Sequence, residues 1–155
     1  MTDAAQIVRT WRERIPGGDM ALLAEVVDLT GYTETCLGLT GWTVGFETAM
    51  GNYFRNMVQP WSDVVASDEE LVSGPDAAAA SGMCFDGHPI QADSAVLIRS
   101  RIEATHVGEF LGVAATGRRV AWDNLALVWV RDRRVVGQWA QPDLWGIYLQ
   151  LIAPE

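Results

Sequence analysis

The feature that most constrains the fold is an alternation of apolar and polar residues that begins at Ala95. Residues 95–106 place apolar side chains and His106 on one face of an extended chain, and mostly charged side chains on the other. A repeat of two residues is typical of a β-strand with one buried face. The sequence therefore predicts a strand that ends at Thr105-His106 and buries its even-numbered side chains.

Two further strands follow. Residues 120–130 are apolar on both faces, and Asp132-Arg133 marks a tight turn before a last strand over residues 134–140. A strand that is apolar on both faces must be covered on both. Helices of the same chain can cover one face of this strand, and a second subunit can cover the other face. We therefore expect a homodimer built on the open face of the sheet.

The N-terminal part has the three- to four-residue spacing of amphipathic helices. We predict helices over residues 4–15, 20–28 and 42–57; Pro16-Gly17-Gly18 separates the first two, and Gln59-Pro60 ends the third. Helices followed by hairpin-linked strands give an α+β domain. Three to four helices on the concave side of a strongly curved antiparallel or mixed sheet would form a cone with an apolar interior.

The segment between the helices and the sheet is harder to assign. Residues 61–73 are acidic and fit either a strand or a helix, whereas residues 74–94 hold glycines, prolines and four consecutive alanines. We predict a loop-rich excursion at about residues 68–94 within a single domain that spans residues 1–155. Long loops are often functional, so we expect this one to border the mouth of a pocket or the dimer contact.

Composition argues against several classes of function. The net charge is −9, with 20 acidic and 11 basic residues, whereas nucleic-acid binding needs a basic patch. All the basic side chains are arginines, so lysine Schiff-base chemistry is not available. No stretch is apolar over the ~20 residues of a membrane helix, and the N-terminus lacks the apolar core of a signal peptide. We expect a cytoplasmic protein without nucleic-acid or membrane partners.

Two residues at the ends of predicted strands could carry acid–base chemistry. Asp143 would either cap the helix over residues 144–151 or lie beside an aromatic pocket, where burial would raise its pKa toward the range of a general base. His106 is either a hydrogen-bonded core residue or a catalytic residue. The residues alone leave these alternatives open.

Other side chains suggest a ligand but no metal. The cluster of Cys84, Asp86, His88 and Asp93 matches no zinc spacing, so we expect no metal there. Seven tryptophans are enough to form the walls of a site for a flat ligand. The residues expected to contact substrate are Trp139, Trp122, Trp11 and Phe54.

The C-terminal third carries a recognisable series of motifs. They are, in order, Thr105-His106, Gly108-Glu109-Phe110, Leu111-Gly112, Thr116-Gly117-Arg118-Arg119, Trp139, Asp143, Gly146 and Gln150-Leu151. This series resembles the SnoaL-like polyketide cyclase family, which has the NTF2-like fold. The resemblance implies that Asp143, in the motif W-x-x-x-D, is the catalytic acid/base and that His106 lines the pocket near the substrate carbonyl. Gln138 departs from the pattern, because many members have histidine there.

The resemblance implies a small cofactor-free enzyme of antibiotic or related natural-product biosynthesis. It would close a ring by intramolecular aldol condensation of a hydrophobic, polyketide-like substrate, with Asp143 moving the proton and His106 donating a hydrogen bond to the oxyanion. Two alternatives fit the same residues: another enzyme on this fold (a cofactor-independent hydroxylase, an epoxide hydrolase or an isomerase) or a non-catalytic ligand-binding protein. A buried, unpartnered Asp143 would favour an enzyme, and an Asp143 paired with arginine would favour a binding protein.

Overall fold

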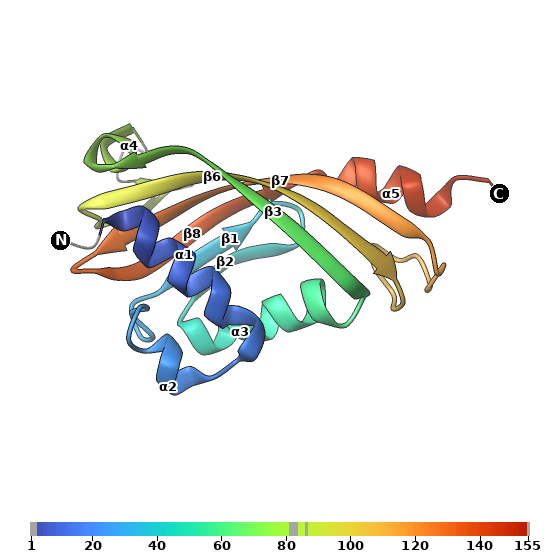
Figure 1. Ribbon diagram of the computed structural model, residues 1–155, viewed down its shortest axis with the longest axis horizontal. Coiled ribbons are helices and arrows are strands. Elements are labelled where there is room, and N and C mark those ends of the chain that lie inside the picture. Colours follow the sequence, from blue (N-terminus) through green and yellow to red (C-terminus); the bar gives the residue numbers. More distant parts are fainter. Residues whose placement is uncertain (1–2, 81–83, 86, 155) are drawn as a thin grey trace.

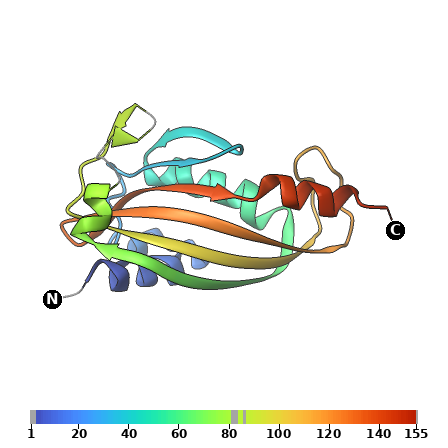
Figure 2. The same ribbon diagram turned by 90° about the horizontal axis from the view of Figure 1, so that it is seen from above.

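Six strands form one mixed sheet in the computed structural model, which describes residues 3–154 except 81–83 and 86. The order across the sheet is β2-β1-β8-β7-β6-β3 (Figures 1 and 2). The strands are β1 (Thr33–Cys36), β2 (Thr40–Val44), β3 (Trp61–Gly74), β6 (Ser94–His106), β7 (Arg119–Arg131) and β8 (Arg134–Pro142). β1 runs parallel to β8, and all other neighbours in this sheet are antiparallel. The sheet is open, with β2 and β3 at its edges.

Helices cover mainly one side of the sheet. They are α1 (Ala4–Arg14), α2 (Met20–Leu23), α3 (Phe46–Tyr53), α4 (Pro75–Ala80) and α5 (Leu144–Ile152), with a 3-10 turn at Ile15–Gly17 and a π-helical turn at Phe54–Val58. Figure 1 shows the sheet arching over α1, α2 and α3, while α4 and α5 lie toward opposite ends. The predicted α+β class with a curved mixed sheet is confirmed. In the described part of the chain, no helix is long and apolar enough to span a membrane.

The C-terminal strands follow the predicted alternation. In β6, the even-numbered residues from Val96 to His106 are buried, and the charged residues that alternate with them are exposed. β7 and β8 are joined by a turn at Asp132 and Arg133, whose φ angles are 50° and 63°. Positive φ at both central residues is what a two-residue hairpin turn requires, so the short-range pattern predicts this hairpin correctly.

Two of the predicted helices are too long. Helix α2 ends at Leu23 and not at residue 28, because the chain then bonds to β8: the amide of Asp28 donates to the carbonyl of Val135 at 3.0 Å. The helix predicted over residues 42–57 begins only at Phe46. Trp42 belongs instead to β2, which forms a hairpin with β1. The sequence pattern predicts neither β1 nor β2. β1 pairs with β8, which lies far away in the sequence, and the hairpin of β1 with β2 lacks the alternation of polar and apolar residues that would indicate it.

The predicted loop-rich excursion begins later than residue 68. β3 extends to Gly74, which pairs with Ala95, while Trp61 at its other end pairs with His106. This long-range pairing with β6 explains why an acidic segment that is ambiguous by itself becomes a strand. The short hairpin of β4 (Cys84–Phe85) and β5 (His88–Pro89) follows α4.

The segment after β3 covers part of the outer face of the sheet. It contributes Ala77, Ala78 and Ile90 to a buried cluster that also contains Ala95, Trp129 and Val136. Trp129 is 0% exposed as a result. The same chain therefore covers part of the outer face of β7, which is apolar and needs to be buried.

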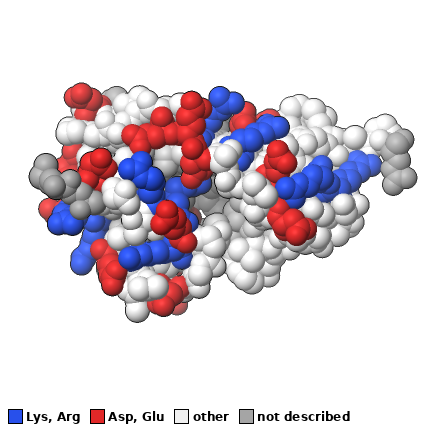
Figure 3. Space-filling model, viewed as in Figure 1, with Lys and Arg blue, Asp and Glu red and all other residues white. Residues whose placement is uncertain are grey.

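Helix α1 is fixed to the inner face by burial and by charge. Asp3 caps it by accepting a hydrogen bond from the amide of Gln6 at 2.8 Å, and Trp11 is buried. Arg12 donates to both carboxylate oxygens of Asp68 on β3, at 2.6 and 2.9 Å. Two-pronged pairs of this kind fix geometry as well as adding energy. Figure 3 shows acidic and basic side chains interspersed over α1 and β3.

The buried cluster on the outer face gives a test of this fold. Ile90→Ala should lower the free energy of unfolding by about 2–4 kcal/mol, because Ile90 is 5% exposed and its removal leaves a cavity beside Trp129. The matched control is Val72→Ala, since Val72 is 48% exposed and should change stability by no more than about 0.5 kcal/mol. Urea unfolding followed by tryptophan fluorescence measures both. Equal effects of the two variants would contradict the packing described here.

Candidate active site

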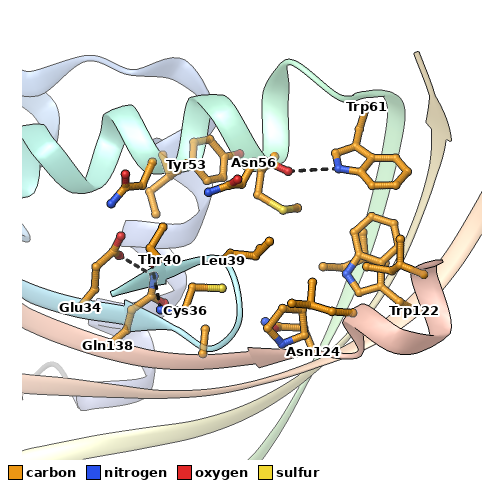
Figure 4. Close-up of a pocket in the computed structure, with 18 of the residues that line it drawn as sticks. Glu34, Cys36, Leu39, Thr40, Tyr53, Asn56, Trp61, Trp122, Asn124 and Gln138 are labelled. Atoms are coloured by element: carbon orange, nitrogen blue, oxygen red, sulfur yellow. Dashed lines mark hydrogen bonds between the residues drawn. The ribbon is translucent and has the colours of Figure 1, made fainter. Parts of the chain in front are cut away.

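A cavity of about 160 Å³ lies between the inner face of the sheet and helices α1 and α3. Most of its wall is aliphatic or aromatic. The charged and polar side chains in the wall, apart from its tryptophans, are Arg12, Glu34, Thr40, Asn52, Tyr53, Asn56, Asn124 and Gln138. Figure 4 shows that the cavity has two different ends, with Glu34 and Gln138 at one and Trp61 and Trp122 at the other. An apolar pocket with a few convergent polar groups is typical of a small-molecule site.

The polar end is built by the parallel pairing of β1 with β8. Their register sets Glu34 beside Gln138. Successive side chains of a strand point to opposite faces, so alternate residues of β8, namely Gln138, Ala140 and Pro142, line the cavity. This arrangement brings a carboxyl group and an amide from distant parts of the sequence into contact.

Glu34 is the acidic residue of this cavity. Its side chain is 7% exposed, and its Oε2 accepts hydrogen bonds from the hydroxyl of Tyr32 at 2.9 Å and from Nε2 of Gln138 at 3.0 Å. Burial raises the pKa of Glu34 above its ordinary value, and the hydrogen bonds from Gln138 and Tyr32 offset part of that rise. A carboxyl group whose pKa is raised by burial is suited to exchange protons near neutral pH.

Two neighbouring groups are kept protonated. Burial, followed by the charge of Glu34, raises the pKa of the Tyr32 hydroxyl well above its ordinary value. The same two causes raise the pKa of the Cys36 thiol to about 12. A thiol with such a pKa is a poor nucleophile. Tyr32 can therefore serve as a hydrogen-bond donor to Glu34, and Cys36 forms part of the wall.

The other end of the cavity is aromatic. The ring of Trp61 lies 4.9 Å from that of Trp122 and 5.1 Å from that of Phe110, measured between centroids. Trp61 is held in place by a hydrogen bond from its indole N–H to the carbonyl of Asn56 at 3.1 Å. Tilted and edge-on rings at these distances present flat surfaces and edges on which an unsaturated ligand can pack.

Asp143 lies on the other side of the sheet from this cavity. It lines a separate groove together with Arg99, Asp123 and Gln141. Its side chain is exposed and caps α5, with Oδ1 accepting from the amide of Gly146 at 2.9 Å. Asp143 is thus neither buried without a partner nor paired with an arginine among the described residues, so neither of the two diagnostic arrangements expected for it is found.

His106 is a core residue in this structure. It is 0% exposed and does not line the cavity, but its ring packs against Trp61 at 5.2 Å. Nδ1 accepts a hydrogen bond from the amide of Thr116 at 3.2 Å. Burial lowers the pKa of His106, and the backbone of Gly108 offsets part of this effect. The imidazole is therefore neutral at neutral pH and supports the aromatic wall.

The structure does not bring Asp143 and His106 together. The amide of Asp143 donates to the carbonyl of Asp123, and Asp123 pairs with Arg101, five residues before His106 on β6. At about 3.3 Å per residue, this separates Asp143 and His106 by roughly 16 Å along the sheet. A single small substrate in the cavity cannot contact both in this arrangement.

The four expected substrate contacts divide into two groups. Trp11 and Trp122 line the cavity. Phe54 is 51% exposed on the π-helical turn. Trp139 packs on the outer face with Trp42 and the cluster around Trp129. The prediction that Trp139 contacts substrate in the cavity is wrong, because in β8 Gln138 points inward and Trp139 outward.

The segment expected to border the pocket contributes nothing to the cavity wall within its described part. In the cluster of Cys84, Asp86, His88 and Asp93, His88 stacks on Trp42 with ring centroids 4.1 Å apart, and Asp93 accepts a hydrogen bond from the amide of Asp132 at 3.1 Å. Asp86 and the side chain of Cys84 lie outside the described residues. Among the described residues, no three histidine, cysteine or acidic side chains gather as metal ligands would.

Sequence reasoning did not identify Glu34. The strand that carries it was not predicted, so nothing indicated which way its side chain would point. One signal was present: Glu34 is the only charged residue between Gly31 and Phe46. Tyr32 and Glu34 are also two residues apart, and in a strand this spacing places both on one face.

The family comparison supports the resemblance seen in the sequence. The model of the SnoaL-like polyketide cyclase family matches residues 87–151. This match confirms the resemblance to SnoaL-like polyketide cyclases. It spans β5 to β8 and most of α5, and thus the part of the chain that carries the motifs. Among curated proteins, none matches this chain closely enough to be identified as a relative.

Solved structures extend the likeness to nearly the whole chain. A protein of Jannaschia sp. CCS1 described as a candidate SnoaL-like polyketide cyclase has a TM-score of 0.70 and 18% identity, covering 97% of this chain and 94% of its own. IdmH of Streptomyces antibioticus, described as a candidate polyketide cyclase, has a TM-score of 0.66 and 20% identity over 95% and 96% of the two chains. An NTF2-like protein of Burkholderia thailandensis E264 has a TM-score of 0.64 and 15% identity over 99% and 100%. At these identities the likeness shows the NTF2-like fold alone.

The raised pKa of Glu34 predicts how stability depends on pH. Its pKa is raised from 4.5 on folding, so the unfolded chain ionises Glu34 first. The wild type should lose stability relative to Glu34→Gln as the pH rises from about 4.5 to the raised pKa. Each pKa unit corresponds to about 1.4 kcal/mol, or about 3–6 °C in melting temperature for a chain of this size.

Thermal unfolding of both proteins between pH 4 and pH 8 measures this difference. The surface variant Glu103→Gln is the control, because Glu103 is exposed. A melting-temperature difference between wild type and Glu34→Gln that is the same at every pH would contradict a raised pKa.

Proposed function

We propose that this protein is a small cofactor-free enzyme, similar to polyketide cyclases, that closes a ring in a hydrophobic polyketide-like substrate within the cavity. The observation that carries the proposal is a largely apolar cavity with an aromatic end, whose polar end holds one buried carboxyl group, Glu34, beside the amide of Gln138. The match to the SnoaL-like family over residues 87–151 supports the class of chemistry.

The reaction would be an intramolecular aldol addition. A base removes a proton from a carbon next to a carbonyl, and the electrons of that C–H bond pass into an enolate. The enolate carbon attacks a second carbonyl of the same molecule, a C–C bond forms, and the new alkoxide takes up a proton. Substrate and product are isomers. The apolar wall would hold the flexible substrate in the folded shape that ring closure needs.

The identity of the base is the finer part of this proposal. The resemblance implies Asp143, and the wall that the cavity shares with the outer groove (Asn124, Pro142 and Leu144) lies next to it. In its present place, however, the carboxylate of Asp143 is exposed and caps α5. It could act on a substrate that reaches the outer groove, but not on one confined to the cavity.

Ring closure of a defined probe tests the function. The probe is an aromatic polyketide with a ring ketone and a free 1,3-dicarbonyl side chain, and the expected product is its ring-closed isomer, detected by chromatography and mass spectrometry at unchanged mass. Wild-type protein should give this isomer faster than buffer. Binding of the probe without any ring closure would overturn the enzymatic proposal and favour a ligand-binding protein.

Asp143→Asn in the same assay tests the role of Asp143. Asparagine can still cap α5, so the variant should fold with a nearly unchanged melting temperature. We expect single-turnover ring closure within about tenfold of wild type, because loss of a true general base typically costs about 10²–10⁴-fold and Asp143 does not face the cavity. A loss of about 10²-fold or more would assign the base to Asp143.

We also propose a homodimer through the outer face of β7 and β8. Leu125 lines the outer groove, where Leu37 is 38% exposed and Trp145 is 67% exposed. Such apolar side chains beside one another favour a protein contact. Light scattering should give twice the mass of one chain at micromolar concentration, and Leu125→Glu should shift the protein to monomers. A monomeric wild type would contradict the proposal.

A further inference from the structure

We propose that Glu34 is the proton-transferring residue of the cavity, acting on a carbon next to a carbonyl group of a flat, unsaturated ligand. This inference rests on the proposed function only in taking the cavity as the place of reaction. Neither the family match, which begins at residue 87, nor the motifs of the C-terminal third assign a role to Glu34.

The geometry of Glu34 leaves one oxygen available. Both of its hydrogen bonds, from Tyr32 and Gln138, go to Oε2. No donor to Oε1 is found in the part of the chain that the structure describes. Oε2 therefore anchors the carboxyl group, while Oε1 can accept a proton from a ligand in the cavity. A general base must lie within hydrogen-bond reach of the proton that it removes, and an oxygen without a donor can make that contact.

The charge of Glu34 is not neutralised by a cation. Arg12 is the basic residue in the cavity wall, and its guanidinium is bound to Asp68 and to the hydroxyl of Ser100 at 3.2 Å. Glu34 forms no ion pair with any described residue. A carboxylate that is buried without a cation is more basic than one in water, and this increases its ability to take a proton from carbon.

A second group in the wall suggests what the ligand offers. The indole N–H of Trp11 is buried and finds no acceptor among the described residues. Buried donors are nearly always paired, so an acceptor atom from a ligand or a water is expected there. A carbonyl oxygen meets this need. An unsaturated ketone with an acidic C–H would therefore match a donor, a base and the aromatic end formed by Trp61 and Trp122.

The alternative is a purely structural role, in which Glu34 only joins β1 to β8 through Tyr32 and Gln138. A catalytic and a purely structural role of Glu34 predict different rates for a reaction that needs only a base in an apolar cavity. The Kemp elimination of 5-nitrobenzisoxazole is such a reaction. A base removes the C3 proton, the N–O bond breaks, and the coloured product 2-cyano-4-nitrophenolate forms without a cofactor.

The experiment compares wild type, Glu34→Gln, Glu34→Asp and Glu103→Gln with this probe. We expect wild type to accelerate the elimination, and its rate to rise with pH through a titration above the ordinary glutamate range. Glu34→Gln should lose about 10²-fold or more of the rate over buffer. Glu34→Asp should keep the titration with a lower rate, and the exposed Glu103→Gln should match wild type within about twofold.

A positioning variant separates a base from a structural link. Gln138→Leu removes a hydrogen bond that stabilises the ionised form of Glu34. The midpoint of the rate–pH profile should therefore move to higher pH, a change that a merely structural role would not produce. A Glu34→Gln protein that folds, as judged by circular dichroism, and reacts as fast as wild type would overturn the inference. So would a wild type no faster than Glu34→Gln.

Failure here can be told apart from failure of the proposed function. Kemp elimination that depends on Glu34, combined with no ring closure of the polyketide probe, would leave Glu34 as a base and remove the cyclase proposal. Ring closure that is unaffected by Glu34→Gln would leave the function and overturn this inference. If Glu34→Gln does not fold, the rate–pH profiles of the other two variants decide the question. A wild-type rate in Glu34→Asp together with an unchanged midpoint in Gln138→Leu would overturn the inference.

Discussion

The parallel pairing of β1 with β8 is the contact on which the candidate site depends. In this register Thr33 lies opposite Gly137 and Glu34 opposite Gln138. A Cβ atom on Gly137 would lie 2.2 Å from the carbonyl oxygen of Thr33, so the approach of the two strands requires glycine there. Without that close approach the amide of Gln138 would not reach Glu34, and the buried carboxyl group would lack one of its two donors. A buried polar group left without partners costs about 1–3 kcal/mol.

The motifs shared with SnoaL-like polyketide cyclases serve mainly to hold the C-terminal half together. Gly108 packs against the backbone of Gln59, where a Cβ atom would be 2.6 Å from its carbonyl oxygen. Arg118 donates to the carbonyl of Leu151 at 3.1 Å, near the end of α5. Gln150 bonds both backbone groups of Ala121, at 3.0 and 2.8 Å, at a point of β7 beyond the end of β8. Each of these residues either forms hydrogen bonds with backbone groups or allows two backbone segments to approach closely. This explains why the motifs indicate the fold more securely than the chemistry.

The cavity depends on elements that the motifs do not include. Glu34, at its polar end, comes from β1, and part of its wall comes from α1 and α3. The C-terminal strands provide the opposite surface, with Trp122 from β7 and Gln138 from β8. A site assembled from both halves can differ between chains that share the same C-terminal scaffold, since a fold does not by itself determine the chemistry that it carries.

The sequence alone determined the α+β class, the strands β6, β7 and β8, the turn at Asp132 and the first helix. These follow from short-range periodicity and from turn and capping residues. Only the tertiary structure decided which face of β8 lines the cavity, because a repeat of two residues separates the faces without telling which is inside. With apolar side chains on both faces, long-range packing placed Gln138 inward and Trp139 against Trp42. The same holds for Glu34, whose position depends on pairing with residues about one hundred positions away.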